Sequence, residues 1–212
     1  EIAKAARAVA QAQAAYDAAS VGHRAAVASE AAFQQADIGN LAALRVVFKQ
    51  AQPEAILHFA GSALVGESME QPLKYFQNNT ANALNLLHCA AKFGVGKFIF
   101  SSTCSTYGIP EIIPISETTP QRPVNPYGES KRMFEQMLKW HAEQTGTEAV
   151  IFRYFNAAGA TAKLGEHHNP ETHLIPRILQ TALGRHESFS IFGTEHPTPD
   201  GTCVRDYVHV SD

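Results

Sequence analysis

Three short apolar runs, separated by stretches of helical pattern, constrain the fold of this chain more than any other feature. Nearly continuous apolar runs of this length are typical of strands buried on both faces of a parallel sheet. They cover residues 55–60, 97–102 and 148–154. Amphipathic spacing and terminal proline or glycine residues predict helices over 41–50, 72–93 and 125–144. Strands that alternate with helices in this way predict an α/β fold with a doubly wound parallel sheet.

The pattern changes near both ends of the chain. Residues 1–35 are rich in alanine and predict a helix over 1–10, with little strand character. After residue 158 the sequence predicts a loop over 159–172, a helix over 173–184, a short strand over 189–192 and a loop over 194–202. We therefore expect a parallel-sheet domain over 1–158, followed by part of a smaller substrate-covering region over 159–212.

Composition excludes several classes of protein. The 212 residues carry a net charge of −3 without a clustered basic face, which argues against a nucleic-acid partner. No apolar run approaches the length of a membrane span, so no membrane partner is expected. The three cysteines are widely spaced and favour a reducing, cytoplasmic location. No histidine pair shows ligand spacing, so no metal site is predicted.

Polar residues follow the ends of the predicted strands, where parallel sheets bind their ligands. Thr103 ends the second run, and Tyr127 and Lys131 lie one turn apart on the helix that follows it. A nearby ammonium lowers the pKa of a phenol, so this spacing predicts Tyr127 as a general base. Taken alone, the pair is more often found on a surface helix that carries a solvated lysine.

Longer motifs narrow the interpretation. They read HFAG at 58–61, VGES at 65–68, SSTCSTYG at 101–108, NPYGESK at 125–131, RYFNAAG at 153–159 and PTPDGTCVRDYVH at 197–209. Together and in this order they resemble the UDP-galactose 4-epimerases of the extended short-chain dehydrogenase/reductase family. The resemblance runs from about residue 16 to residue 212 and implies a Rossmann-like fold.

The resemblance implies an NAD-dependent inversion at C4 of a UDP-hexose, UDP-galactose to UDP-glucose, through a 4-keto intermediate. In the family the catalytic set would be Thr103, Tyr127 and Lys131. The residues implied for NAD are Asp17, Asp37, Ile38, Phe59, Ala60, Gly61, Asn78, Ser101, Tyr127, Lys131 and Tyr154. Those implied for the UDP-sugar are Thr103, Tyr127, Asn156, His173, Leu174, Phe192 and Arg205. The domains would then be an NAD-binding domain over 1–158 and a partial UDP-sugar-binding region over 159–212.

Several of these residues have structural alternatives. Asp17 and Asp37 are also suited to helix or turn caps, and Phe59 and Phe192 to the core. Asn78 is also suited to a bond with a neighbouring loop. Arg205 is also suited to an ion pair with Asp206.

The sequence departs from the family in two places. Dehydratases of this family carry an Asp–Glu pair after the threonine, whereas Cys104 and Ser105 stand here, which argues against dehydration. The first strand and glycine-rich loop are not recognisable before Gly22. The chain is thus either a fragment of an epimerase or a truncated, non-catalytic UDP-sugar-binding homologue, and a 4-epimerase of another UDP-sugar stays open. The family implies a homodimer through the helices near 72–93 and 125–144.

Overall fold

The computed structural model describes residues 34–161, 165, 168, 171–191 and 193–212. The expected helix over 1–10, the expected absence of a first strand, and the residues Asp17 and Phe192 fall outside these residues. The described elements belong to a compact unit that runs from Asp37 to Asp212.

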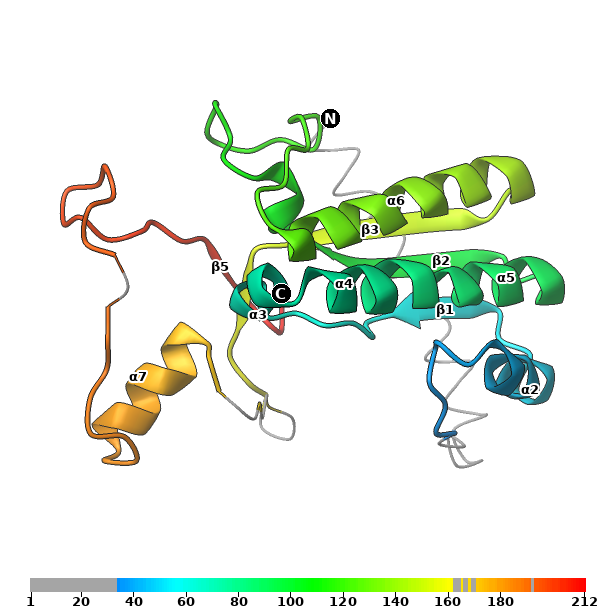
Figure 1. Cartoon of the computed structure of the whole chain (residues 1–212), viewed down its shortest axis with the longest axis horizontal. Helices are drawn as coiled ribbons and strands as arrows, with labels where there is room; N and C mark the ends of the chain where they lie inside the picture. Colours follow the sequence, from blue (N-terminus) through cyan, green and yellow to red (C-terminus); the bar gives the residue numbers. More distant parts are fainter. Residues whose placement is uncertain (1–33, 162–164, 166–167, 169–170, 192) are drawn as a thin grey trace. The chain divides into compact units, whose positions relative to one another are not determined.

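Three parallel strands form the main sheet, in the order in which they occur along the chain (Figure 1). They are β1 (Ala55–His58), β2 (Lys97–Thr103) and β3 (Glu148–Tyr154). β2 lies in the centre, so that Phe100 is level with His58 on one side and Ile151 on the other. The prediction of a parallel α/β sheet is confirmed, and all three strands end at the same edge.

The helix α6 (Pro126–Thr145) begins and ends where the sequence predicts. Asn125 accepts a hydrogen bond from the backbone N–H of Gly128 at 2.8 Å, and Pro126 occupies the first turn, where its missing N–H costs nothing. Gly146 ends the helix in the left-handed conformation, with φ of +75°. The helix α2 (Leu41–Ala51) also begins after a capping asparagine, because the side chain of Asn40 accepts a hydrogen bond from the backbone N–H of Ala43.

The helix expected over 72–93 is divided. It consists of α4 (Pro72–Tyr75), a π-helical segment η1 (Phe76–Asn82) and α5 (Leu84–Phe93). Within η1, the hydroxyl of Thr80 donates to the backbone carbonyl of Ser130 on α6 at 3.0 Å. π-helical segments arise where side chains must meet a tertiary partner, and sequence periodicity does not reveal them. A short helix, α3 (Val65–Glu70), precedes α4 and was not predicted.

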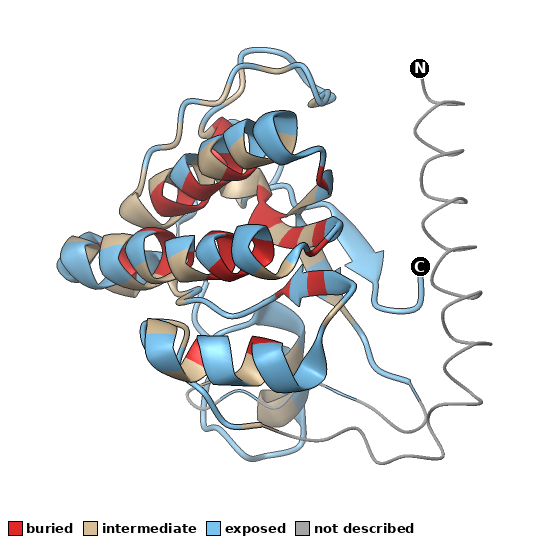
Figure 2. Cartoon of the chain, turned by 90° about the vertical axis from the view of Figure 1, so that its right-hand side faces the viewer, coloured by how far each residue is buried: buried red, intermediate tan, exposed pale blue. Residues whose placement is uncertain are grey.

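The core lies between the sheet and its covering helices (Figure 2). Phe98, Phe100 and Phe134 are fully buried there. The expectation that β1 is buried on both faces is wrong, because Leu57 is 53% exposed while Ile56 and His58 on the other face are buried. Among the described elements, α5 and α6 pack apolar side chains against only the face of the sheet that carries Ile56 and His58. β1 therefore alternates between buried and exposed residues. The second helical layer of a doubly wound fold stays a prediction.

A second, two-stranded sheet brings the end of the chain back to the end of β3. In it β4 (Asn156–Ala158) pairs in parallel with β5 (Tyr207–His209). The helix predicted over 173–184 is present as α7 (Leu174–Ala182). The strand expected over 189–192 is wrong for its described part, residues 189–191, which form no ladder bonds with another strand. Within the described residues, every helix is too short or too polar to cross a membrane.

Candidate active site

The carboxyl edge of the main sheet gathers the predicted site residues. Thr103 at the end of β2 pairs in register with Tyr154 at the end of β3. Residues 59–61 follow the end of β1 at the same edge, and the first turn of α6 carries Tyr127. The parallel topology thus brings together residues that lie far apart in the sequence.

Lys131 reaches this edge from the second turn of α6. It is only 5% exposed, and its Nζ donates to the carbonyl oxygen of Ser101 at 3.1 Å. The ammonium also lies 5.0 Å from the ring centroid of Phe100. Burial lowers the pKa of Lys131 to about 8, because desolvation disfavours its charged form. The alternative of a solvated surface lysine is therefore wrong.

Tyr127 differs from the prediction in its electrostatics. Burial raises the pKa of its phenol, and a hydrogen bond with Thr103 opposes this shift by favouring the phenolate. The expected lowering of the Tyr127 pKa by Lys131 is not found in the protein alone. The reason is geometric, since helical spacing places the two residues on one face but leaves the Lys131 ammonium bonded to Ser101. The ring of Tyr75 meets that of Tyr127 edge-on at 6.3 Å between centroids.

Gly61 lies against the lysine. An added Cβ at this position would lie 3.2 Å from Nζ of Lys131 and 3.0 Å from Oδ1 of Asn79. Asn79, which the sequence analysis missed, accepts from the N–H of Ser62 at 2.8 Å and donates to its carbonyl at 3.0 Å. Its amide also donates to Ser130 on α6 at 3.1 Å, so one buried side chain fixes the loop beside Lys131.

The remaining residues implied for the cofactor differ in their surroundings. Phe59 is 61% exposed, so the alternative that it belongs to the core is wrong. Asn78 donates to Ser62 Oγ at 3.0 Å, the kind of loop contact that its structural alternative predicts. Asp37 accepts from the N–H of Gly39 as a turn cap does, and the carbonyl of Ile38 accepts from Asn85 at 2.8 Å. Contacts of these residues with NAD stay predictions.

The residues implied for the sugar nucleotide lie in three places. Asn156 donates to the backbone carbonyl of Asp206 at 2.7 Å, which joins the start of β4 to the segment that carries Arg205. Burial raises the pKa of the Cys104 thiol, next to Thr103, and the charge of Arg205 opposes this shift. His173 pairs with Glu171 at 3.0 Å just before α7, and Leu174 begins that helix. Their contacts with a sugar nucleotide stay predictions.

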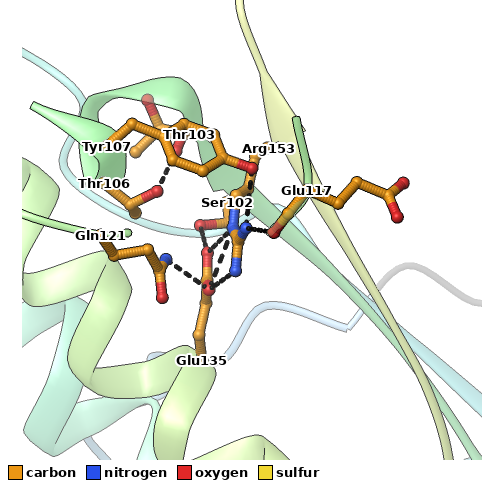
Figure 3. Close-up of polar contacts among 8 residues, drawn as sticks. All are labelled: Ser102, Thr103, Thr106, Tyr107, Glu117, Gln121, Glu135 and Arg153. Atoms are coloured by element: carbon orange, nitrogen blue, oxygen red, sulfur yellow. Dashed lines mark hydrogen bonds and ion pairs between the residues drawn. The ribbon is translucent and has the colours of Figure 1, made fainter. Parts of the chain in front are cut away.

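A buried polar network lies beside the site and was also missed (Figure 3). Glu135 on α6 is fully buried and forms an ion pair with Arg153 on β3, with 2.8 Å between Oε2 and Nη2. The hydroxyl of Ser102 also donates to Glu135, and Arg153 donates to the hydroxyl of Tyr107 at 2.7 Å. The sequence signal was a glutamate one turn after Lys131, at a spacing that places both on the same helix face.

Comparison with known proteins agrees with this arrangement. Residues 3–212 match the NAD dependent epimerase/dehydratase family. UDP-glucose 4-epimerase from Streptococcus mutans serotype c is 53% identical over 199 residues, which cover 92% of this chain and 60% of that protein. The enzyme of the same name from Lacticaseibacillus casei is 47% identical over 193 residues, covering 90% of this chain and 58% of that protein.

Solved structures give the same result. The crystal structure of UDP-glucose 4-epimerase from Brucella ovis in complex with NAD matches with a TM-score of 0.80 and 46% identity, covering 84% of this chain and 56% of that one. The enzyme from Bifidobacterium longum in complex with NAD⁺ and UDP matches with a TM-score of 0.79 and 38% identity, covering 84% and 54%. The chain therefore belongs to the NAD dependent epimerase/dehydratase family. It spans about 60% or less of the length of these relatives.

Proposed function

We propose that this chain provides the catalytic edge of an NAD-dependent 4-epimerase that interconverts UDP-galactose and UDP-glucose. The observation that carries the proposal is that the first turn of α6 brings Tyr127 to the sheet edge where Thr103 ends β2 and where Lys131 is buried. Relatives with about half of their residues identical are named UDP-glucose 4-epimerases, which supports the same reaction here.

The residues of the sheet edge fit the cofactor. Gly61 has no side chain beside the Lys131 ammonium. A nucleotide could therefore approach the backbone closely at this position. Lys131 carries three N–H donors, of which one is used by Ser101. Lys131, Tyr154 and residues 59–61 would hold NAD from this side, while Asp37 and Ile38 would meet its adenine. When bound, NAD supplies the oxidant and reductant that carry C4 to the ketone level and back.

The protein contributes a proton acceptor and a rigid position for the reacting carbon. Tyr127 accepts the proton of the 4-hydroxyl group and returns it after C4 has inverted. The Thr103 hydroxyl favours the phenolate that this step requires. Lys131, on the same helix face, would support the phenolate once the site is filled and water is excluded. Asn156 and Arg205 would hold the UDP-sugar, with the Arg205 guanidinium suited to the diphosphate.

The Tyr127→Phe variant tests this assignment. The chain is mixed with NAD and UDP-galactose, and formation of UDP-glucose is measured beside the variant. We expect turnover to fall by at least about 100-fold, because the general base is lost, while binding of UDP changes little. An equal loss of UDP binding and turnover would contradict the role of Tyr127. A folded chain that binds UDP but turns over nothing would favour the non-catalytic alternative.

We also propose that the chain forms a homodimer through α5 and α6. A hollow of about 380 Å³ lies between these helices, lined by Leu84, Leu87, His88, Ala91, Met137, Trp140 and His141. Trp140 is 67% exposed there, and a large exposed aromatic residue beside an apolar hollow favours association. Trp140→Glu should shift the chain towards a monomer in analytical ultracentrifugation, and an unchanged sedimentation coefficient would contradict this interface.

The organisation of the chain follows from the same assignment. Residues 1–158 would form the NAD-binding domain and residues 159–212 part of the UDP-sugar-binding region. The thiols of Cys89, Cys104 and Cys203 are free, which supports a reducing compartment such as the cytoplasm.

A further inference from the structure

A buried ion pair connects the elements that carry the candidate active site. Glu135 is fully buried, and both of its carboxylate oxygens accept hydrogen bonds (Figure 3). The donors are Arg153 through Nε and Nη2, the hydroxyl of Ser102, and Nε2 of Gln121 at 2.8 Å. Apolar residues of similar size often stabilise a core as well as a buried ion pair does, so stability alone does not account for this network.

Three members of the network lie next to residues of the site in the sequence or on the same helix face. Ser102 immediately precedes Thr103 on β2, and Arg153 immediately precedes Tyr154 on β3. Glu135 lies one helical turn after Lys131 on α6. The carboxylate therefore joins the ends of two strands to the helix that carries the catalytic pair.

The network also holds the segment between β2 and α6. Arg153 donates to the hydroxyl of Tyr107 at 2.7 Å and to the carbonyl of Glu117 at 3.4 Å. Its guanidinium lies 5.0 Å from the centroid of the Tyr107 ring. The planar guanidinium of an arginine presents five N–H donors, which allow Arg153 to bond the carboxylate, the phenol and the carbonyl together. Four segments thus converge on one guanidinium–carboxylate pair.

We propose that the Glu135–Arg153 ion pair is a positioning device that fixes Thr103 relative to Tyr127 by anchoring Ser102 to α6. The inference rests on the proposed role of Tyr127 in proton transfer. Glu135 and Arg153 are positioning residues in this scheme, since they act through Ser102 and touch none of the reacting atoms. Errors of about 1 Å in the position of such groups cost about 100-fold in rate.

The Ser102→Ala variant tests the geometry without changing any charge. The titration of Tyr127 is followed by tyrosinate absorbance in the full chain, as the difference between each protein and the same protein carrying Tyr127→Phe. We expect Ser102→Ala to raise the pKa of Tyr127 by up to about one unit, because Thr103 is no longer held where it favours the phenolate. This measurement needs neither NAD nor turnover.

Leu138→Ala is the matched control for a loss of stability. Leu138 is fully buried on the same helix, one turn beyond Glu135 on its C-terminal side, and its truncation loosens the core without touching the network. We expect the Tyr127 titration to be unchanged in this variant. The proposal is overturned if Leu138→Ala shifts the titration as far as Ser102→Ala does, or if Ser102→Ala leaves it in place.

Kinetics provide a second, independent readout. Arg153→Met should lower kcat by about 10- to 100-fold while KM for the UDP-sugar changes less than about threefold, because binding groups stay in place. Arg153→Lys keeps the charge and should restore part of kcat. A parallel rise in KM, or equal kcat in the two variants, overturns the proposal. If the unmodified chain shows no epimerisation, the proposed function fails. The Tyr127 titration still tests whether the ion pair fixes Thr103 relative to Tyr127.

Discussion

Burial of Lys131 should cost the protein stability, and this cost should depend on pH. The pKa of Lys131 is lowered from 10.5 to about 8 by desolvation. The unfolded chain therefore binds more protons than the folded chain between these two pH values. For a lysine with a lowered pKa, the destabilisation is complete below pH 8 and is relieved as pH rises towards 10.5.

The size of the effect follows from the two pKa values. At one unit for about 1.4 kcal/mol, burial of the charged lysine costs about 3 kcal/mol at pH 7 and about 1.4 kcal/mol at pH 9.5. A Lys131→Met variant avoids this cost, although it loses the bond to Ser101, worth about 1–2 kcal/mol. We expect the free energy of unfolding of the variant, relative to the original chain, to fall by about 2 kcal/mol between pH 7 and pH 9.5.

Urea unfolding of the two proteins at both pH values measures this difference directly. Lys139→Met is the control, because Lys139 is exposed on the same helix. Its stability relative to the original chain should change little over the same pH range. A Lys131→Met difference that is constant between pH 7 and pH 9.5 would refute the reasoning, since it would mean that Lys131 titrates alike in the folded and unfolded chains.

Two further variants test the core beneath the site. The pKa of His58 is lowered from 6.5 to about 4, first by burial and then by the charge of Lys131, so the chain should lose about 3 kcal/mol of stability as pH falls from 6.5 to 4. His58→Phe should remove most of this loss in urea unfolding, and an equal loss in both proteins would contradict it. Phe134→Ala should cost about 3–5 kcal/mol, because the fully buried ring packs 4.7 Å from that of Phe100. A loss of less than about 1 kcal/mol in the free energy of unfolding, measured with urea, would contradict this and would mean that neighbouring side chains fill the space of the missing ring.

The elements that the sequence predicts well are those with local signals. The apolar run of β2 and the Asn125–Pro126 start of α6 are set by a few neighbouring residues, and the structure has both. The π-helical segment η1 depends instead on Thr80 meeting α6 across about 50 residues of sequence. The ladder between β4 and β5 is likewise a pairing of distant segments, and neither strand exceeds three residues. Local patterns carry no information about such partners.

The candidate site shows the same division. Spacing places Tyr127 and Lys131 on one face of α6, and the structure has both at the sheet edge. Spacing does not determine where the Lys131 ammonium points, and for this reason the expected effect on the Tyr127 pKa was wrong for the protein alone. The sequence also could not predict the partner of Glu135, because Arg153 lies on another element and only the fold brings the two residues together.

The pattern of α6 explains why polar residues can mark a site inside an otherwise ordinary helix. Its inward face holds Tyr127, Lys131, Phe134, Glu135 and Leu138, at the spacing that an apolar stripe has in a core helix. Two of these positions carry charges that a core normally excludes, and each charge is buried at a cost. Glu135 recovers that cost through a complete set of donors, whereas Lys131 keeps a single hydrogen bond and a lowered pKa. A charge left so incompletely compensated is retained for chemistry rather than for stability, which favours Lys131, rather than Glu135, as the residue that meets a ligand.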